Sequence, residues 1–220
     1  MRKIISRILN IVIAVLALWA WIAMVFRLGR HGDLSAGGLQ TLRYFTVLSN
    51  LMQAGVSLAY AFGAKPRRWK YASTVAVALT FTVVLVFLGP LYGYPSMYAG
   101  ANFIFHLVVP VLAMAEFIFL DREGTFRLTD SLLAMIPMLA YGHFYVGNLL
   151  INGIEGNDWY SFARGGPLSA AIVFCLILHG NWGLALLLRL PRRARRPKND
   201  GRNDAYDPRA ERPKQPQERL

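Results

Sequence analysis

The sequence predicts an all-α membrane protein with six transmembrane helices, and both its composition and the placement of its charges indicate this fold. Of the 220 residues, 55% are apolar and only 16% are charged, whereas a soluble domain carries about 25% charged residues. The charges gather in short connectors, and the stretches between them are long enough for a helix of about 20 apolar residues to cross a bilayer. Six such stretches are expected, at residues 5–26, 41–63, 71–92, 101–120, 131–150 and 167–190.

The first stretch is expected to be a retained membrane anchor. Arg2, Lys3 and Arg7 precede an apolar run over residues 8–26, which is longer than the about 7–15 residues of a signal-peptide core. The run ends at Arg27 without a cleavage site of small residues. We therefore count it as the first of the six helices.

The composition changes sharply after residue 190. Five of the last thirty residues are proline, and most of the others are charged or polar. Such a segment buries too little apolar surface to offset its ordering entropy, so residues 191–220 are expected to form a disordered cytoplasmic tail. Its basic run at 192–196 is expected to stop translocation and to contact anionic membrane lipids.

The lysines and arginines predict the orientation in the cell membrane. If the N-terminus is cytoplasmic, twenty of the 24 basic residues lie in cytoplasmic segments and four lie outside. Cytoplasmic loops carry such an excess, and six crossings return the C-terminus to the same side. Both termini are therefore expected in the cytoplasm. Topology accounts for the net charge of +12, and without a recognised motif we do not expect nucleic acid as a partner.

Polar side chains inside the predicted helices mark candidate functional positions. Four of them share one face of the second helix at spacings of four, three and four: Thr46, Asn50, Gln53 and Ser57. The fourth helix carries Asn102 and His106 one turn apart, and Glu116, which must be neutral or paired, lies farther along. His143 and His179 lie in the last two helices, where Cys175 is expected to be a small buried hydrophobe.

Depth brings three of these residues to one level. Counted from the outer helix ends, Thr46 and His106 lie about 7–8 Å inside the membrane and His143 about 10 Å inside. A structural interpretation competes with this one, because membrane threonines commonly bond back to their own helix and polar residues join helices. We find no histidine cluster, G-x-S-x-G elbow or Walker loop in the sequence, so neither a metal nor a cofactor is expected.

Two motifs carry a resemblance to a known group. Residues 43–51 read RYFTVLSNL and residues 102–110 read NFIFHLVVP. With these motifs as anchors, most of residues 1–190 resembles predicted six-pass bacterial membrane proteins that are distantly similar to the androgen-induced and androgen-dependent integral membrane proteins of animals. The animal family implies hydrolysis of fatty acid esters of hydroxy fatty acids by a threonine nucleophile and a histidine. Carried over, these roles fall on Thr46 and His106.

This resemblance leads to a hypothesis of a lipid esterase that acts on fatty-acyl esters at the outer leaflet. His106 would serve as the base for the Thr46 hydroxyl, Asn102 would orient the imidazole, and Asn50 would donate to the oxyanion. Further supporting candidates are Tyr44, His143 and Asp158. Asp158 belongs to the 157–166 loop, which is expected to cap the outer end. The alternatives are a transporter of small solutes or lipids and a non-catalytic membrane scaffold.

Overall fold

The regular structure of the chain is helical throughout the described residues. The computed structural model describes residues 1–27, 37–121 and 124–192, and it confirms the predicted all-α class. The helical elements, in chain order, are α1 (Arg2–Val25), η1 (Gly38–Arg43), α2 (Phe45–Ala61), α3 (Arg67–Val83), η2 (Val84–Leu88), α4 (Gly89–Tyr92), α5 (Tyr94–Met97), α6 (Ala101–Phe103), η3 (Ile104–Val108), α7 (Val109–Ala115), η4 (Glu116–Leu120), α8 (Leu128–Leu133), α9 (Ile136–Asn152), α10 (Pro167–Arg189) and η5 (Leu190–Arg192).

Five continuous helical segments in this part of the chain have the length and apolar character of membrane spans. They are Arg2–Val25, Arg67–Tyr92, Ala101–Leu120, Leu128–Asn152 and Pro167–Arg192. The predicted span at 41–63 differs, because residues 38–43 form a 3-10 helix and α2 has only 17 residues. At 1.5 Å per residue α2 is about 25 Å long. These helices support a membrane-embedded protein.

The surface of α1 has the character expected in contact with lipid. One of its faces is packed inside the bundle through Ala14, Ala17 and Ala20, which are fully buried, and small residues of this kind let membrane helices approach closely. The opposite face is apolar as well and exposes Ile4, Ile8, Ile11, Val15, Trp19 and Ile22. An apolar outer face of this length fits a hydrocarbon solvent better than water.

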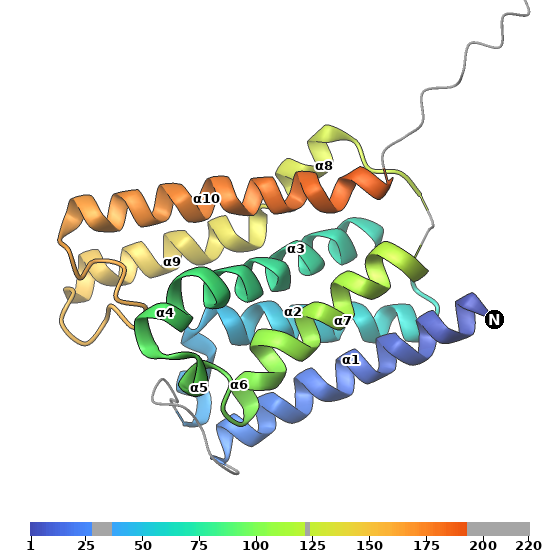
Figure 1. Ribbon diagram of the computed structural model, residues 1–220, viewed down its shortest axis with the longest axis horizontal. Coiled ribbons are helices and arrows are strands. Elements are labelled where there is room, and N and C mark those ends of the chain that lie inside the picture. Colours follow the sequence, from blue (N-terminus) through green and yellow to red (C-terminus); the bar gives the residue numbers. More distant parts are fainter. Residues whose placement is uncertain (28–36, 122–123, 193–220) are drawn as a thin grey trace, which may run out of the picture.

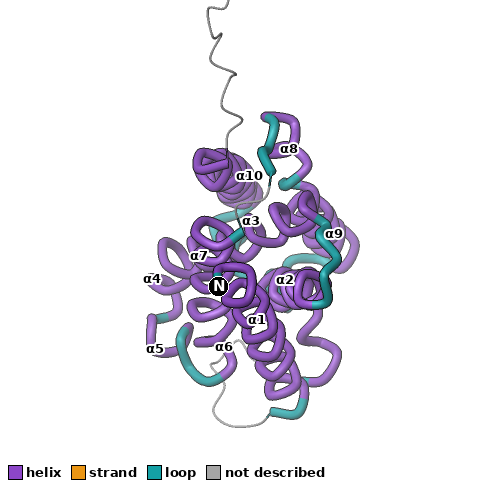
Figure 2. The backbone as a smooth tube through the Cα atoms, turned by 90° about the vertical axis from the view of Figure 1, so that its right-hand side faces the viewer, coloured by secondary structure: helices purple, strands orange, loops and turns teal. Residues whose placement is uncertain are grey.

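α3 is the central helix of the bundle. Every residue from Lys70 to Thr80 is buried, and α3 packs against α2, α7 and α10. Viewed along the helices, α1 lies on one side of the bundle and α10 on the other (Figure 2). The N-terminus and the end of α10 lie at the same end of the molecule, while the 153–166 loop lies at the opposite end (Figure 1).

A buried ion pair joins three of the segments near the end that holds the N-terminus. Lys70 Nζ of α3 lies 2.5 Å from Glu116 Oε2, and both side chains are at most 1% exposed. Glu116 Oε1 accepts hydrogen bonds from Ser6 Oγ at 2.6 Å and from Asn10 Nδ2 at 3.0 Å, both on α1. The lysine amine also lies 3.9 Å from the centre of the Tyr60 ring. Glu116 is therefore paired, as expected for an acid inside a membrane helix. Its partner, Lys70, lies in the basic connector between the predicted spans 41–63 and 71–92.

Arg192 is also buried, although the sequence places it in a solvated tail. Only 4% of it is exposed. Its guanidinium lies 3.5 Å from Asp121 Oδ2 and 4.3 Å from the centre of the Phe117 ring. The disordered tail was expected to begin at residue 191, but Leu190–Arg192 form a short 3-10 helix. Residues 193–220 of the expected tail lie outside the described part of the chain.

Removal of one charge from the buried pair should destabilise the protein more than removal of both. We expect Lys70→Met and Glu116→Leu alone each to cost about 3–5 kcal/mol of unfolding free energy, because each leaves an uncompensated buried charge. The double variant should recover much of that loss. Thermal unfolding in detergent measures the effect. Arg68→Ala, which removes a pair whose arginine side chain is 74% exposed, is the control. An additive double variant would contradict the coupling.

Candidate functional site

A small cavity at the outer end, as assigned from the sequence, brings Thr46 and His106 together. It has a volume of about 20 Å³, which is enough for one water molecule. Its lining comes from α1, α2 with the residue before it, η2, the 101–120 segment and the 153–166 loop, and it consists of Met24, Tyr44, Thr46, Val47, Leu88, Asn102, His106 and Tyr160. The predicted catalytic pair and two of the supporting candidates, Tyr44 and Asn102, therefore share one cavity.

The His106 ring is held in one tautomer. Its Nδ1 lies 2.6 Å from the Met97 carbonyl oxygen, and since a carbonyl only accepts hydrogen bonds, Nδ1 must carry the proton. In the neutral imidazole, Nε2 then keeps its lone pair and can accept a proton. His106 is only 5% exposed. The arrangement supplies a base whose orientation is fixed by the backbone.

The backbone around His106 is not a regular α-helix. Residues 104–108 form a π-helical turn, and Pro110 follows two residues later. Proline has no N–H, so the carbonyl of His106 lacks its usual i+4 donor. π-Helical turns occur frequently at functional sites. Here the turn coincides with the one histidine of the described chain that lines this cavity.

Thr46 keeps its hydroxyl available. It lies in the first turn of α2, is 9% exposed, and lines the cavity. Among the described residues no hydrogen bond engages its hydroxyl, although its carbonyl accepts from Ser49 Oγ at 3.1 Å and Asn50 Nδ2 at 2.7 Å. The back-bonding that is common for membrane threonines is therefore absent here. The expected span began at residue 41, whereas α2 begins at Phe45. Thr46 is therefore the second residue of its helix and not the sixth.

The two asparagines have roles other than those predicted. Asn50 donates to the carbonyls of Thr46 and, at 3.2 Å, Phe105, so its amide is occupied and joins α2 to the 101–120 segment. It does not line the cavity and cannot serve as the oxyanion donor. Asn102 was expected to orient the imidazole, but the Met97 carbonyl holds the ring instead. Asn102 lines the cavity and takes the place of Asn50 as the candidate donor.

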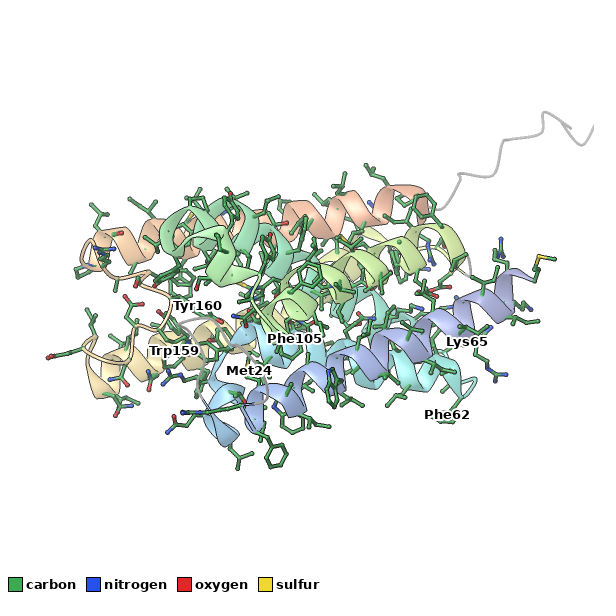
Figure 3. The ribbon with its side chains drawn as sticks, turned by 60° about the horizontal axis from the view of Figure 1, so that its bottom comes forward. Met24, Phe62, Lys65, Phe105, Trp159 and Tyr160 are labelled. Atoms are coloured by element: carbon green, nitrogen blue, oxygen red, sulfur yellow. The ribbon has the colours of Figure 1, made fainter. Side chains whose placement is uncertain are left out.

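Tyr160 is the site residue that the sequence analysis missed. Its hydroxyl accepts a hydrogen bond of 2.8 Å from the backbone N–H of Phe45 and so caps the start of α2. Burial raises the pKa of Tyr160 to about 12, which keeps the hydroxyl protonated at neutral pH. The loop carrying it packs on the aromatic rings of Tyr44 and Tyr145. Figure 3 shows Tyr160 and Trp159 at the end of the bundle opposite Lys65.

Asp158 organises this loop and does not line the cavity. Its carboxylate accepts hydrogen bonds from the Tyr145 hydroxyl and from the backbone N–H groups of Phe162 and Ala163. The bond from Tyr145 joins the loop to α9, and the two bonds from the backbone fix the turn of the loop itself. The 157–166 loop therefore packs over this end of the bundle, and Asp158 acts as its structural anchor.

A second, apolar cavity adjoins the first. Its volume is about 50 Å³, and Thr46, Leu88 and Tyr160 line both cavities. The other residues around it come mainly from α3, α9 and α10, and they include Leu79, Val83, Met138, Gly142, Phe174 and Ile177. Thr46 thus lies between the cavity that contains His106 and an apolar one.

The remaining histidines lie away from this site. His143 is exposed, bonds to the carbonyl of Leu139 at 2.7 Å, and lines a groove between α9 and α10. His179 is exposed as well and lies beside Cys175, which is itself exposed rather than buried. The predicted placement of His143 with Thr46 and His106 is therefore wrong, because that side chain points outward. The described residues contain no cluster of metal ligands.

The comparisons with known proteins found no match. This result holds for protein-family models, for curated proteins and for solved structures.

Loss of the Tyr160 hydroxyl should loosen the start of α2. We expect Tyr160→Phe to cost about 1 kcal/mol of unfolding free energy, the usual contribution of one hydrogen bond, because the Phe45 N–H loses its acceptor. Chemical denaturation in detergent would measure the loss. Tyr98→Phe is the matched control, since its hydroxyl makes no hydrogen bond with the described residues and its removal should change little. Equal stabilities for both variants would argue against the cap.

Proposed function

We propose that this protein is a membrane-embedded esterase that hydrolyses fatty-acyl esters, with Thr46 as nucleophile and His106 as base. The observation that carries the proposal is the shared cavity, which is lined by Thr46 with its unbonded hydroxyl, by His106 with its fixed imidazole and by Asn102. A nucleophilic hydroxyl needs a base within hydrogen-bonding reach, directly or through one water. The cavity volume allows that one water.

The reaction proceeds in two balanced steps. Thr46 Oγ attacks the ester carbonyl carbon while its proton passes to His106 Nε2, and Asn102 donates to the oxyanion. The protonated imidazole then gives its proton to the departing alcohol, which leaves an acyl-threonine. Water then gives a proton to the same Nε2 and attacks the acyl carbon, and as the bond to Thr46 Oγ breaks, the imidazolium returns that proton to Thr46 Oγ, so the fatty acid is released and both residues regain their starting state. Because the cavity holds one water, the ester must displace side chains at its border as it enters.

The apolar cavity supports a fatty-acyl substrate. It begins at Thr46 and is lined by aliphatic and aromatic side chains of α3, α9 and α10. An acyl chain that enters from the bilayer is already out of water, so the cavity would bind it by van der Waals contact with these side chains. The motifs at 43–51 and 102–110 support the same substrate class through their similarity to the six-pass family, to which we propose this chain belongs.

The membrane arrangement follows in the same proposal. We place α2 as the sixth span, because its neighbours α1 and α3 cover it and a helix of about 25 Å needs only modest bilayer adjustment. Both termini are then cytoplasmic and the catalytic cavity lies near the outer leaflet. The transporter alternative has less support, since Glu116 is held in an ion pair and His179 is exposed on the bundle surface.

Substitution of the catalytic pair separates chemistry from packing. Thr46→Val and His106→Gln should abolish both fluorophosphonate labelling and ester hydrolysis in membranes, by at least about a hundredfold for a lost base. Thr46→Ser keeps the hydroxyl and should retain part of the activity. Thr82→Val is the matched control, because it removes a hydroxyl that is bonded only to its own helix. It should leave labelling and ester hydrolysis unchanged. Full activity in Thr46→Val would refute the mechanism.

A larger side chain at position 142 should lower the activity on long acyl chains and so shift the preference toward shorter ones. Gly142 lines the apolar cavity, and an added Cβ would make only ordinary contact with Phe174 at 3.5 Å. Gly142→Val is therefore expected to lower kcat/KM for a long-chain nitrophenyl ester about tenfold while leaving the acetate ester unchanged. Gly147→Val, at a position with open space, is the control. Equal losses on both esters would place the acyl chain elsewhere.

Topology can be tested by impermeant maleimide in intact cells. In a background with Cys175→Ala, a cysteine at the exposed position Glu155 should be labelled from outside. A cysteine at the exposed position Ala64 should react only after the membrane is opened. The reverse pattern would place the catalytic cavity near the inner leaflet.

A further inference from the structure

A basic basin lies at the end of the molecule opposite the catalytic cavity. It has a volume of about 280 Å³ and is lined by the start of α1, by the end of α2 with the turn after it, and by the end of η4. The lining residues are Arg2, Lys3, Ile4, Ser6, Arg7, Tyr60, Gly63, Lys65, Leu120 and Asp121. Lys65 and Phe62 mark this end of the bundle, away from Trp159 and Tyr160 (Figure 3).

The charges around the basin favour an anion. Four basic side chains from two elements surround it and Asp121 is the acid in its lining. Arg7 is held in position, because its Nε donates to the Ala61 carbonyl at 2.6 Å, at the last turn of α2. A fixed guanidinium beside flexible lysines is a common arrangement for binding phosphate oxygens.

The wall of the basin also contains a polar group that lacks a partner. The Tyr60 hydroxyl is buried and makes no hydrogen bond within the described chain, and a buried donor without an acceptor is costly. Its ring is fixed by the Lys70 amine. Ser6, another lining residue, is bonded to Glu116. An anionic oxygen in the basin would give the Tyr60 hydroxyl the acceptor that the protein does not supply, once the side chains that cover this hydroxyl move aside.

The setting of the basin favours a ligand that is partly apolar. Ile4 lines it, and Ile5 and Ile8 expose apolar surface on the same end of α1. Charged and apolar surfaces therefore meet at one place, as they do at the headgroup boundary of a bilayer. A soluble phosphate would use only the charged part.

We infer that this basin is a binding site for a phosphate-bearing anion, with the headgroup of an anionic phospholipid as the occupant that also uses the isoleucine surface. The site is independent of the proposed esterase, because it lies at the other end of the bundle and shares no lining residue with either outer cavity. It also differs from the contact expected of the basic tail, whose residues 193–220 lie outside the described part of the chain.

The test uses the purified full-length protein in uncharged detergent. Binding of phosphatidylglycerol in mixed micelles is measured by titration, with phosphatidylcholine as the zwitterionic lipid and inorganic phosphate as the soluble competitor. We expect Arg2→Gln with Lys3→Gln to weaken phosphatidylglycerol binding about 25-fold, at about fivefold for each basic residue. Tyr60→Phe keeps the ring over Lys70 and should weaken binding about tenfold.

A charge-matched variant controls for general attraction. Arg127→Gln with Arg164→Gln removes two exposed basic residues that do not line the basin, and it should bind the lipid like the unchanged protein. The tail is present in every variant, so its contribution cancels. Competition by inorganic phosphate would identify a phosphate site without lipid preference, and failure to compete would identify the lipid. Equal binding by both double variants, or binding of neither probe, would overturn the inference.

Discussion

The Lys70–Glu116 ion pair is the interaction on which the arrangement of the bundle depends. A charge inside a membrane protein is expensive unless it is paired and hydrogen-bonded, and here each member finds its partner on a different segment. The carboxylate also receives Ser6 and Asn10 of α1, so α1, α3 and the 101–120 segment must meet at one place. That meeting puts α3 in the centre, where its residues from Lys70 to Thr80 are buried on all sides.

The two ends of the bundle are held together by different kinds of interaction. At the end with the N-terminus, paired charges satisfy one another, and Arg192 bonded to Asp121 extends the network to the end of α10. At the other end, hydroxyl groups bond to backbone: Tyr160 accepts from Phe45 and Tyr141 donates to the carbonyl of Arg43 at 2.7 Å. Hydroxyl bonds cost less to break than buried ion pairs, so the end with the 153–166 loop is the less costly one to open.

Both candidate sites lie where polar groups remain without a partner. Thr46 and His106 line one cavity, and Tyr60, whose hydroxyl makes no hydrogen bond with the described residues, lines the basin at the other end. α2 connects the two, since Thr46 is in its first turn and Tyr60 in its last. The short helix that fell below the length of an ordinary span therefore carries residues of both sites, and the helices around it provide its burial.

The sequence by itself determined the helical class and the long apolar segments, because hydrophobicity along the chain reports the solvent that each segment requires. Only the tertiary structure decided which side chains face the interior. In a soluble helix the polar face marks the outside, but a helix in lipid is apolar on both faces, so its rotation is hidden in the sequence. For this reason the sequence did not predict that His143 is exposed, or that Asn50 and Asn102 have other contacts than expected. It also gave no sign of Tyr160 in the cavity. Lys70 was misplaced for a related reason: a lysine next to a basic turn has the pattern of a solvated residue, and its burial depends on an acid 46 positions away in the chain.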